Sequence, residues 1–192
     1  MDEPLTPERF KELLRRCYMT SDEQLLADFQ RSLPFQDALF DRWERARRLG
    51  FGKGASIYNS SFVYGNVRVG DQTWIGPNTI LDGSDGNLSI GAYCSISSGV
   101  QIYTHDTVRW ALSRGTEDRI TAPVSIGDCV YIGPQSVIAA GVRIGDYCVV
   151  GANSFVNKDV ESRSVVVGSP ARPIGRVIGE GKDVRIVDDA EF

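Results

Sequence analysis

Aliphatic residues recur at every sixth position along most of the chain, beginning at Ile57. The run continues to Leu81, shifts by three residues, resumes at Ile90, and after a longer gap continues from Ile126 to Val156. A helix would repeat its apolar positions about every 3.6 residues and a half-buried strand every second residue. A period of six therefore indicates a solenoid in which each unit is a short strand followed by a corner. The positions in this register are all isoleucine, leucine or valine: Ile57, Val63, Val69, Ile75, Leu81, Ile90, Ile96, Ile102, Ile126, Ile132, Ile138, Ile144, Val150 and Val156.

Three units of this kind close one triangular coil, and stacked coils form a parallel β-helix. The aliphatic side chains point inward and lie on their equivalents in the neighbouring coils, about 4.8 Å away along the axis. Glycine follows the aliphatic residue in many units, as at Gly76 and Gly133, where it permits the tight backbone path of a corner. The predicted fold class is mainly β, a parallel β-helix of hexapeptide repeats over residues 53–177.

Residues 1–52 are predicted to form a separate α-helical region. Thr6 and Pro7 are typical of a helix start, and the segment Ser21 to Gln24 fits a capping box that would begin a second helix. The pattern predicts a third helix from Gln36 to Leu49. Because the ends of a solenoid need covering, we expect this region to cover one end of the coil.

Two further segments carry little predictive pattern. The stretch from Arg42 to Arg48 is rich in arginine, which we interpret as a solvated helix face rather than a binding patch. Residues 178–192, acidic at their end, are expected to form a C-terminal tail.

The six-residue register is interrupted twice. The shorter interruption lies at Gly83 to Asn87, and the longer one spans residues 103–123. Ile102 and Ile126 are 24 residues apart, or four units, so the coil resumes in phase after extruding an arm. Loops that project from a rigid scaffold often carry function, and the only histidine of the chain, His105, lies at the start of this arm.

Composition narrows the classes of function. The formal net charge of −4 argues against nucleic acid as a partner, because such proteins favour basic faces. No apolar stretch is long enough to cross a bilayer, and the first residues lack the basic and apolar parts of a secretory signal. The four cysteines lack metal-binding or disulfide spacing, so we expect reduced thiols that pack as small hydrophobes in a cytoplasmic protein.

Several motifs together resemble the hexapeptide-repeat acyltransferases, and in particular their sugar O-acetyltransferase branch, which includes galactoside, maltose and polysaccharide acetyltransferases. The resemblance covers about residues 60–177. The motifs are Asn78-Thr-Ile-Leu-Asp82, the arm histidine His105, Pro-Val-Ser-Ile-Gly-Asp at 123–128, Val-Tyr-Ile-Gly at 130–133, Val-Val-Gly-Ala-Asn-Ser at 149–154, Asn157-Lys158-Asp159 and the closing Val-Gly-Ser-Pro-Ala-Arg at 167–172.

This resemblance implies a left-handed coil, a homotrimer with sites between neighbouring prisms, and acetyl-CoA as co-substrate without a required metal. It places a general base at His105, and an imidazole suits that role because its ordinary pKa near 6.5 allows proton uptake at neutral pH. Glu117 lies at the offset where relatives carry a glutamate near this histidine. Asp106 is a rival for orienting the ring, and both alternatives stay open.

On the acceptor side the resemblance implies Asn78 and Asp82, although short polar residues are also favoured at corners for turn reasons alone. Tyr103 and Trp110 are candidates for stacking on an acceptor ring. Trp110 is equally compatible with packing the arm onto a neighbouring subunit.

For the donor, small residues would keep a groove open for the pantetheine arm and basic residues would bind its phosphates. The candidates for contacting acetyl-CoA are Tyr131, Gly133, Ala139, Gly151, Ala152, Lys158, Arg172 and Arg176.

The expected function is acetyl-CoA-dependent O-acetylation of a sugar hydroxyl, in surface polysaccharide or glycolipid biosynthesis. The segment after His105 resembles polysaccharide-associated members more than maltose enzymes. N-acetylation of a nucleotide-linked amino sugar and acetylation of an antibiotic hydroxyl are alternatives within the same class. A non-enzymatic scaffold would not need the arm, the histidine and the basic closing motif together, so we do not favour it. The partners expected are a small-molecule or glycan acceptor, with neither nucleic acid nor membrane insertion.

Overall fold

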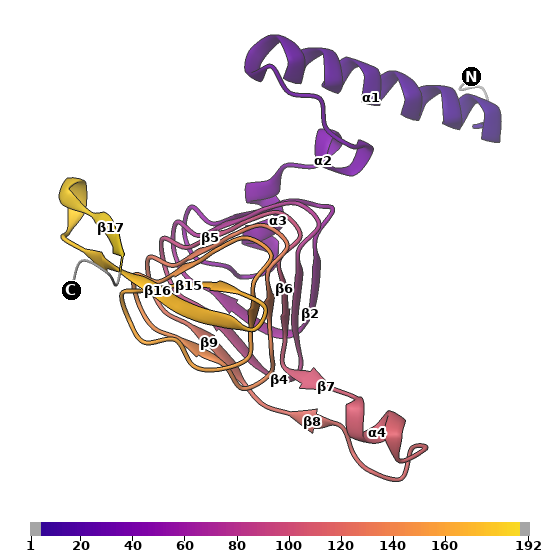
Figure 1. Cartoon of the computed structure of the whole chain (residues 1–192). Coiled ribbons are helices and arrows are strands. Elements are labelled where there is room, and N and C mark those ends of the chain that lie inside the picture. Colours follow the sequence, from indigo (N-terminus) through magenta and orange to yellow (C-terminus); the bar gives the residue numbers. More distant parts are fainter. Residues whose placement is uncertain (1–4, 189–192) are drawn as a thin grey trace.

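The computed structural model describes residues 5–188, so the start and the acidic end of the chain lie outside it. Figure 1 shows a triangular coil from which an arm projects, with helices at its N-terminal end. Short parallel strands form three flat faces along the coil, and this confirms the predicted fold class. No helix within residues 5–188 is long and apolar enough to cross a membrane.

The first face extends along the whole coil as one continuous sheet. Its residues pair in parallel with Ile57 opposite Ile75, Ile132 opposite Ile96 and Val150 opposite Val166. The strands, in spatial order, are β1 (Ser56–Ile57), β3 (Trp74–Ile75), β5 (Ser95–Ile96), β10 (Tyr131–Ile132), β13 (Val149–Val150) and β15 (Ser164–Gly168).

The second and third faces share two long strands that bend around the corner between them. These are β2 (Phe62–Val69) and β4 (Ile80–Ile90), which pair with each other on both sides of the bend. The second face continues with β6 (Gln101–Tyr103), β11 (Val137–Ile138) and β14 (Phe155–Val156), and the third with β9 (Val124–Ile126) and β12 (Arg143–Ile144). Leu81 lies opposite Ile102, and Ile90 lies opposite Ile126, so the register continues across both interruptions.

The residues that define the six-residue period form the interior. All of them are buried except Val63, which lies in the first coil and is partly covered while packing against the core. Cys94 and Cys148 are buried beside them as free thiols, and burial raises the pKa of both. These two cysteines therefore pack as the small hydrophobes that the sequence predicts.

The N-terminal helices differ from the prediction in their boundaries. The cap at Thr6 is confirmed, since its hydroxyl accepts a hydrogen bond from the Arg9 amide at 3.3 Å. The second start at Ser21 is wrong, because α1 (Pro7–Phe29) runs through it without a break. An isolated capping-box sequence cannot begin a helix where the preceding turn already continues.

The single helix expected from Gln36 to Leu49 is also wrong. It is divided into α2 (Phe35–Leu39) and α3 (Arg42–Arg48), with extended backbone at Phe40. Asp41 begins the second helix by accepting a hydrogen bond from the Glu44 amide at 2.6 Å, as a strong cap residue does.

Of the N-terminal helices, only α3 contributes a buried residue to the core of the coil. Its Ala46 is fully buried in the core, whereas no residue of α1 is buried. The Arg45 guanidinium donates hydrogen bonds to the carbonyl oxygens of Tyr58 and Ser61, which joins α3 to the first coil. Burial lowers the pKa of Arg45, against an opposing effect of Asp37. The interpretation of this arginine-rich stretch as a solvated face is therefore wrong for Arg45.

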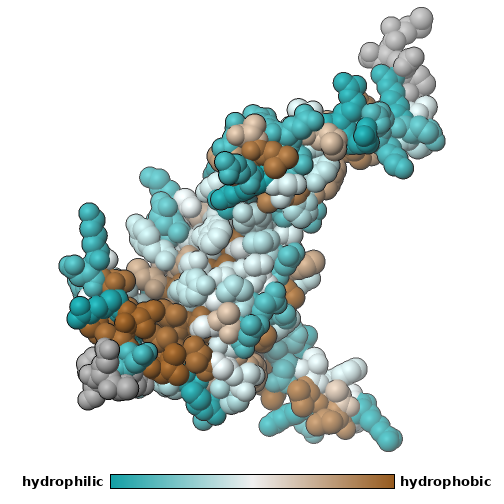
Figure 2. Space-filling model, turned by 45° about the horizontal axis from the view of Figure 1, so that its top comes forward, coloured by the Kyte–Doolittle hydropathy of each residue, from teal (hydrophilic) through white to brown (hydrophobic). Residues whose placement is uncertain are grey.

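The C-terminal segment does not form a simple tail. β16 (Ala171–Ile178) turns back along β15, a short 3-10 helix η1 (Gly181–Asp183) follows, and β17 (Arg185–Asp188) pairs antiparallel with β16. Ile174 and Ile186 are exposed on this hairpin, and Figure 2 shows hydrophobic surface at this end of the molecule.

The interior stacking predicts unequal costs for neighbouring residues of one strand. Ile138→Ala removes a fully buried side chain from the stack, so we expect it to lower the free energy of unfolding by about 2–5 kcal/mol. Val137→Ala, whose side chain points to the other side of the strand, should cost less than about 1 kcal/mol. Urea unfolding followed by circular dichroism measures both. Equal losses would contradict the stacking role.

Candidate active site

The two interruptions of the repeat lie at the same corner of the prism. The residues around Gly83 to Asn87 form the bend of β4 between the second and third faces. The arm leaves after β6 on the second face and returns at β9 on the third. It consists of β7 (His105–Asp106), α4 (Val108–Leu112) and β8 (Ile120–Thr121), and it projects from the coil in Figure 1.

The bend of β4 packs directly against the root of the arm. The Thr104 amide donates to the Asp82 carbonyl at 3.1 Å, and the Ala122 amide donates to the Thr104 carbonyl at 2.9 Å. A Cβ atom added to Gly86 would lie 3.2 Å from atoms of both Thr104 and Ala122. Glycine at this position therefore permits the close approach of the bend and the arm.

His105 faces two carboxylates across this contact. Its Nδ1 atom lies 3.4 Å from Asp82 Oδ2 and 3.4 Å from Asp85 Oδ2. The side chains are 22%, 8% and 14% exposed for His105, Asp82 and Asp85, so the group is largely shielded from water. Within the described chain neither Nδ1 nor Asp85 Oδ2 has a hydrogen-bond partner. The ring is thus held in an acidic surrounding on its Nδ1 side, which leaves Nε2 for a reacting group.

Asp85 was not predicted as a site residue, and it connects the bend to the arm. Its Oδ1 atom lies 2.5 Å from Nη2 of Arg119, which is on the return path of the arm just before β8. The other acid, Asp82, is fixed by a hydrogen bond from the Ser84 amide to its Oδ1 at 2.9 Å. The sequence signal for Asp85 is its place inside the three-residue shift of the register, where an insertion into a rigid scaffold is itself informative.

Asp82, a predicted acceptor residue, is part of this group, and of the other acceptor candidates Tyr103 lies closest to it in the register. Tyr103 pairs with Asp82 between β4 and β6, and its hydroxyl donates to Gln101 Oε1 at 2.7 Å. Burial raises the pKa of Tyr103, and the nearby Asp82 and Tyr64 raise it further. Because the phenol proton is donated to Gln101, the Tyr103 oxygen can take part in a further hydrogen bond as an acceptor.

Neither Asp106 nor Glu117, the two residues expected to orient His105, is paired with its ring. Asp106 Oδ1 accepts a hydrogen bond from the Val108 amide at 3.0 Å, and the Glu117 amide is bound by Ser113 Oγ at 2.8 Å. No ion pair within residues 5–188 joins either carboxylate to His105, and Asp82 and Asp85 take the place beside Nδ1 instead. A catalytic role for Glu117 stays a prediction.

The remaining acceptor candidates are spread out. Asn78 is exposed at a corner with φ of 58°, a left-handed conformation that asparagine tolerates well, which accounts for its presence by turn chemistry. Trp110 is 54% exposed on α4, where its ring lies under Gly115 of the arm. Binding of an acceptor by these two residues stays a prediction.

The donor candidates divide into groups on different parts of the prism. Lys158, Arg172 and Arg176 line one groove of about 440 Å³ at the C-terminal end of the coil. Ala139 follows β11 at the same corner as the arm, whereas Gly133 and Gly151 follow β10 and β13 at the corner between the first and second faces. Tyr131 on β10 and Ala152 after Gly151 belong to this second set. One chain therefore does not gather all the predicted donor residues into one groove.

No group of three or more histidine, cysteine, aspartate or glutamate side chains in the described residues could hold a metal ion.

Comparisons with known proteins agree with the repeat. Residues 123–158 match the family model described as bacterial transferase hexapeptide (six repeats). Nodulation protein L of Rhizobium meliloti is 34% identical over 142 residues, which cover 70% of this chain and 76% of that protein. This chain spans a smaller part of two other relatives, 58% of the length of one and 60% of the length of the other.

Three solved structures share the fold. A hexapeptide-repeat acetyltransferase from Vibrio cholerae has a TM-score of 0.64 at 28% identity and covers 86% of this chain and 91% of its own, and it has also been solved with acetyl coenzyme A. A maltose O-acetyltransferase from Clostridium difficile has a TM-score of 0.56 at 27% identity, with 88% and 86% covered. The N-acyltransferase AntD from Bacillus cereus, in complex with dTDP and 3-hydroxybutyryl-CoA, has a TM-score of 0.57 at 25% identity, with 69% and 86% covered.

The chain belongs to the hexapeptide-repeat acyltransferases. The family model, the extent of the relative from Rhizobium meliloti and the shared coil agree on this, and the predicted resemblance is confirmed at the level of the family.

We expect the ion pair between Arg119 and Asp85 to stabilise the arm against local opening. Arg119→Gln should speed hydrogen exchange of the amides in β7 and β8 by about two- to fivefold, because a partly exposed ion pair contributes a modest free energy. Arg109→Gln, on α4 of the same arm and without an ion pair in the described chain, is the control. Unchanged exchange in Arg119→Gln, measured by mass spectrometry, would show that the pair does not hold the arm.

Proposed function

We propose that this protein is an acetyl-CoA-dependent acetyltransferase that modifies a sugar hydroxyl. The observation that carries the proposal is the arrangement of His105 between Asp82 and Asp85 at the root of the arm, on a coil of the acyltransferase family. A single imidazole with one nitrogen held by carboxylates and the other free is suited to general base catalysis.

In the proposed reaction Nε2 of His105 takes the proton of the acceptor hydroxyl while that oxygen attacks the carbonyl carbon of the acetyl thioester. The carbon–sulfur bond then breaks, and the proton on the ring passes to the departing thiolate to give free CoA. Asp82 and Asp85 fix the orientation of the ring and attract the positive charge that develops on it during the transfer. The Tyr103 hydroxyl, which donates its proton to Gln101, can accept a hydrogen bond from a hydroxyl of the acceptor.

For the donor we propose that the groove containing Lys158, Arg172 and Arg176 binds phosphate groups of CoA. The small residues Ala139, Gly151 and Ala152 would leave room for the pantetheine arm. Because these residues lie on two corners of one prism, we also propose that CoA lies between two chains of a homotrimer, each of which contributes one corner.

The acceptor is proposed to be a sugar of a surface polysaccharide or glycolipid pathway, acetylated in the cytoplasm. The similarity to a maltose O-acetyltransferase supports a sugar hydroxyl. The similarity to AntD, an N-acyltransferase in complex with dTDP, favours a second candidate, N-acetylation of a nucleotide-linked amino sugar. A panel of neutral sugars, glycolipid precursors and nucleotide-linked amino sugars, followed by release of CoA thiol, separates the two.

His105→Asn should lower kcat by about 10²–10⁴-fold, because the acceptor proton then has no base. The affinity for CoA, measured by calorimetry, should stay the same, since the ring acts on the acceptor and not on the nucleotide. Near-normal turnover in His105→Asn would contradict the assignment.

Asp85→Asn should lower kcat by roughly tenfold or more, and by more than Glu117→Gln, because Asp85 lies beside Nδ1 of His105.

Arg172→Gln and Arg176→Gln should each raise the KM for acetyl-CoA by about tenfold with little change in kcat, because a charge-assisted hydrogen bond to phosphate is lost in ground state and transition state alike. Steady-state kinetics at saturating acceptor measures this. Arg185→Gln, on β17 outside the groove, is the matched control. A fall in kcat with unchanged KM would place these arginines elsewhere in the mechanism.

A further inference from the structure

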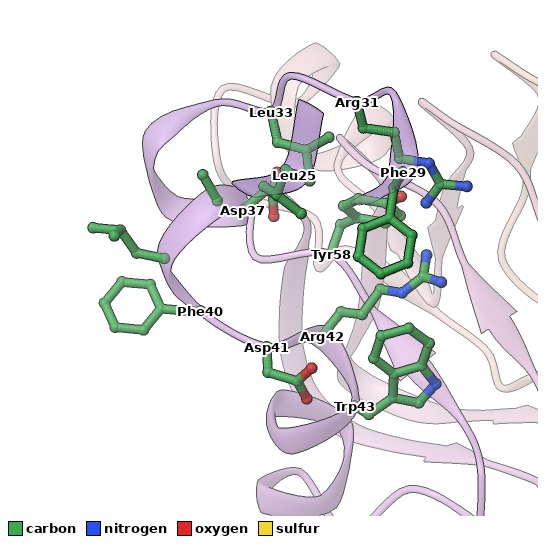
Figure 3. A pocket seen from close by; sticks show the side chains of 12 residues that line it. Leu25, Phe29, Arg31, Leu33, Asp37, Phe40, Asp41, Arg42, Trp43 and Tyr58 are labelled. Atoms are coloured by element: carbon green, nitrogen blue, oxygen red, sulfur yellow. The ribbon is translucent and has the colours of Figure 1, made fainter. Parts of the chain in front are cut away.

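A second hollow lies at the opposite end of the coil from the basic groove, between the N-terminal helices and the first coil. It has a volume of about 310 Å³, within the size range of small-ligand sites, and Figure 3 shows its side chains. We call it the N-terminal pocket. It is lined by Leu25, Phe29, Arg31, Leu33, Asp37, Ala38, Leu39, Phe40, Asp41, Arg42, Trp43 and Tyr58.

Arg42 is held in this pocket by aromatic rings rather than by an acid. Its guanidinium carbon lies 4.1 Å from the ring centre of Trp43, 5.1 Å from that of Tyr58 and 6.0 Å from that of Trp74. Cation–π contacts leave the N–H groups of the guanidinium unpaired. Its Nη1 atom is buried and has no hydrogen-bond partner in the described chain, and a buried donor without an acceptor costs free energy.

The acids of the pocket do not supply that acceptor. Asp37 Oδ1 accepts hydrogen bonds from the amides of Asn59 and Ser60, and Asp41 caps α3 through the Glu44 amide. The Arg31 guanidinium also has no ion pair or hydrogen bond within residues 5–188, although the Arg31 backbone amide donates to the Leu25 carbonyl at 3.3 Å. In Figure 3 the guanidinium groups of Arg31 and Arg42 are directed to the same side of the pocket. The pocket therefore presents two guanidinium groups that form no ion pair with Asp37 or Asp41, the two carboxylates of its lining.

The rest of the wall is apolar and aromatic. Leu25 and Phe29 come from the end of α1, and Trp43 comes from the first turn of α3. Aromatic rings of this kind pack against the apolar face of a ring compound, while paired guanidinium groups bind carboxylate or phosphate in a planar, bidentate geometry. A neutral ligand would leave the guanidinium groups unpaired, and a bare inorganic anion would leave the apolar wall in water.

We propose that the N-terminal pocket binds a sugar that carries a carboxylate or a phosphate, with the anionic group between Arg31 and Arg42 and the ring against the aromatic wall. The site is separate from the proposed catalytic group. Tyr58 directly follows β1 on the first face, whereas His105 leaves the corner between the second and third faces. None of its residues has been assigned to the transfer reaction, so its test does not depend on activity.

The test measures binding to the full-length protein by calorimetry and by tryptophan fluorescence, since Trp43 lines the pocket. The probes are glucuronate, glucose 1-phosphate, glucose and inorganic phosphate. We expect at least one anionic sugar to bind at least about tenfold more tightly than glucose and inorganic phosphate, in keeping with a charge-assisted hydrogen bond. The first two probes distinguish a carboxylate from a phosphate ligand.

Arg42→Gln and Arg31→Gln should each weaken that binding by about tenfold or more, and Arg42→Lys should weaken it less than Arg42→Gln. Arg47→Gln, on the same helix but outside the pocket, is the matched control and should bind as the original protein does. Thermal unfolding checks that Arg42→Gln is folded, and Arg31→Gln tests the same anion site without touching the aromatic stack. Equal binding of glucose, absence of binding by both anionic sugars, or full affinity in both glutamine variants would overturn the proposal.

Discussion

The parallel register between successive coils is the constraint on which the rest of this protein depends. Each interior residue lies on its equivalent in the next coil, as Leu81 on Ile102 and Ile90 on Ile126. A shift of one residue within a face would turn every interior side chain outward. Extra residues can therefore enter only at a corner, where they leave the stack undisturbed. Both interruptions of the repeat follow this rule, and both use the same corner.

Insertions at one corner of neighbouring coils are placed one above the other, and here this builds the candidate site. The bend of β4 supplies Asp82 and Asp85, and the root of the arm supplies His105. Arg119 then connects the returning arm to Asp85. The four side chains come from segments that are separate along the chain but adjacent in the stack, over a core of fully buried isoleucines and leucines. This close-packed core keeps the four side chains in position without a network of hydrogen bonds around them.

The same constraint explains which features could be predicted from the sequence and which could not. The period of six identified the interior residues and the fold, because each repeat reports the same local requirement. His105 was found because it is the only histidine and lies where the period stops. Asp85 belongs to no motif, and although the shift of the register marks its segment as an insertion, only the stacking of the coils brings it beside His105. The break at Phe40 and the half-buried positions of Arg42 and Arg45 also depend on contacts between the helices and the first coil. The helical pattern of residues 1–52 does not indicate those contacts.

The division of the predicted donor residues between two corners bears on how the proposed transfer reaction can proceed. A close-packed triangular coil cannot bend one of its corners toward another, because that would break the stack of interior residues. Gly133 and Gly151 therefore cannot approach Ala139 of the same chain by a change of conformation. If one CoA molecule contacts both sets, the second set must come from another chain, and the acetyl donor can be bound only in the assembled protein. Under the proposed function, a rigid prism with its donor residues divided between two corners makes assembly a condition of catalysis, and the proposed CoA groove lies where two prisms meet.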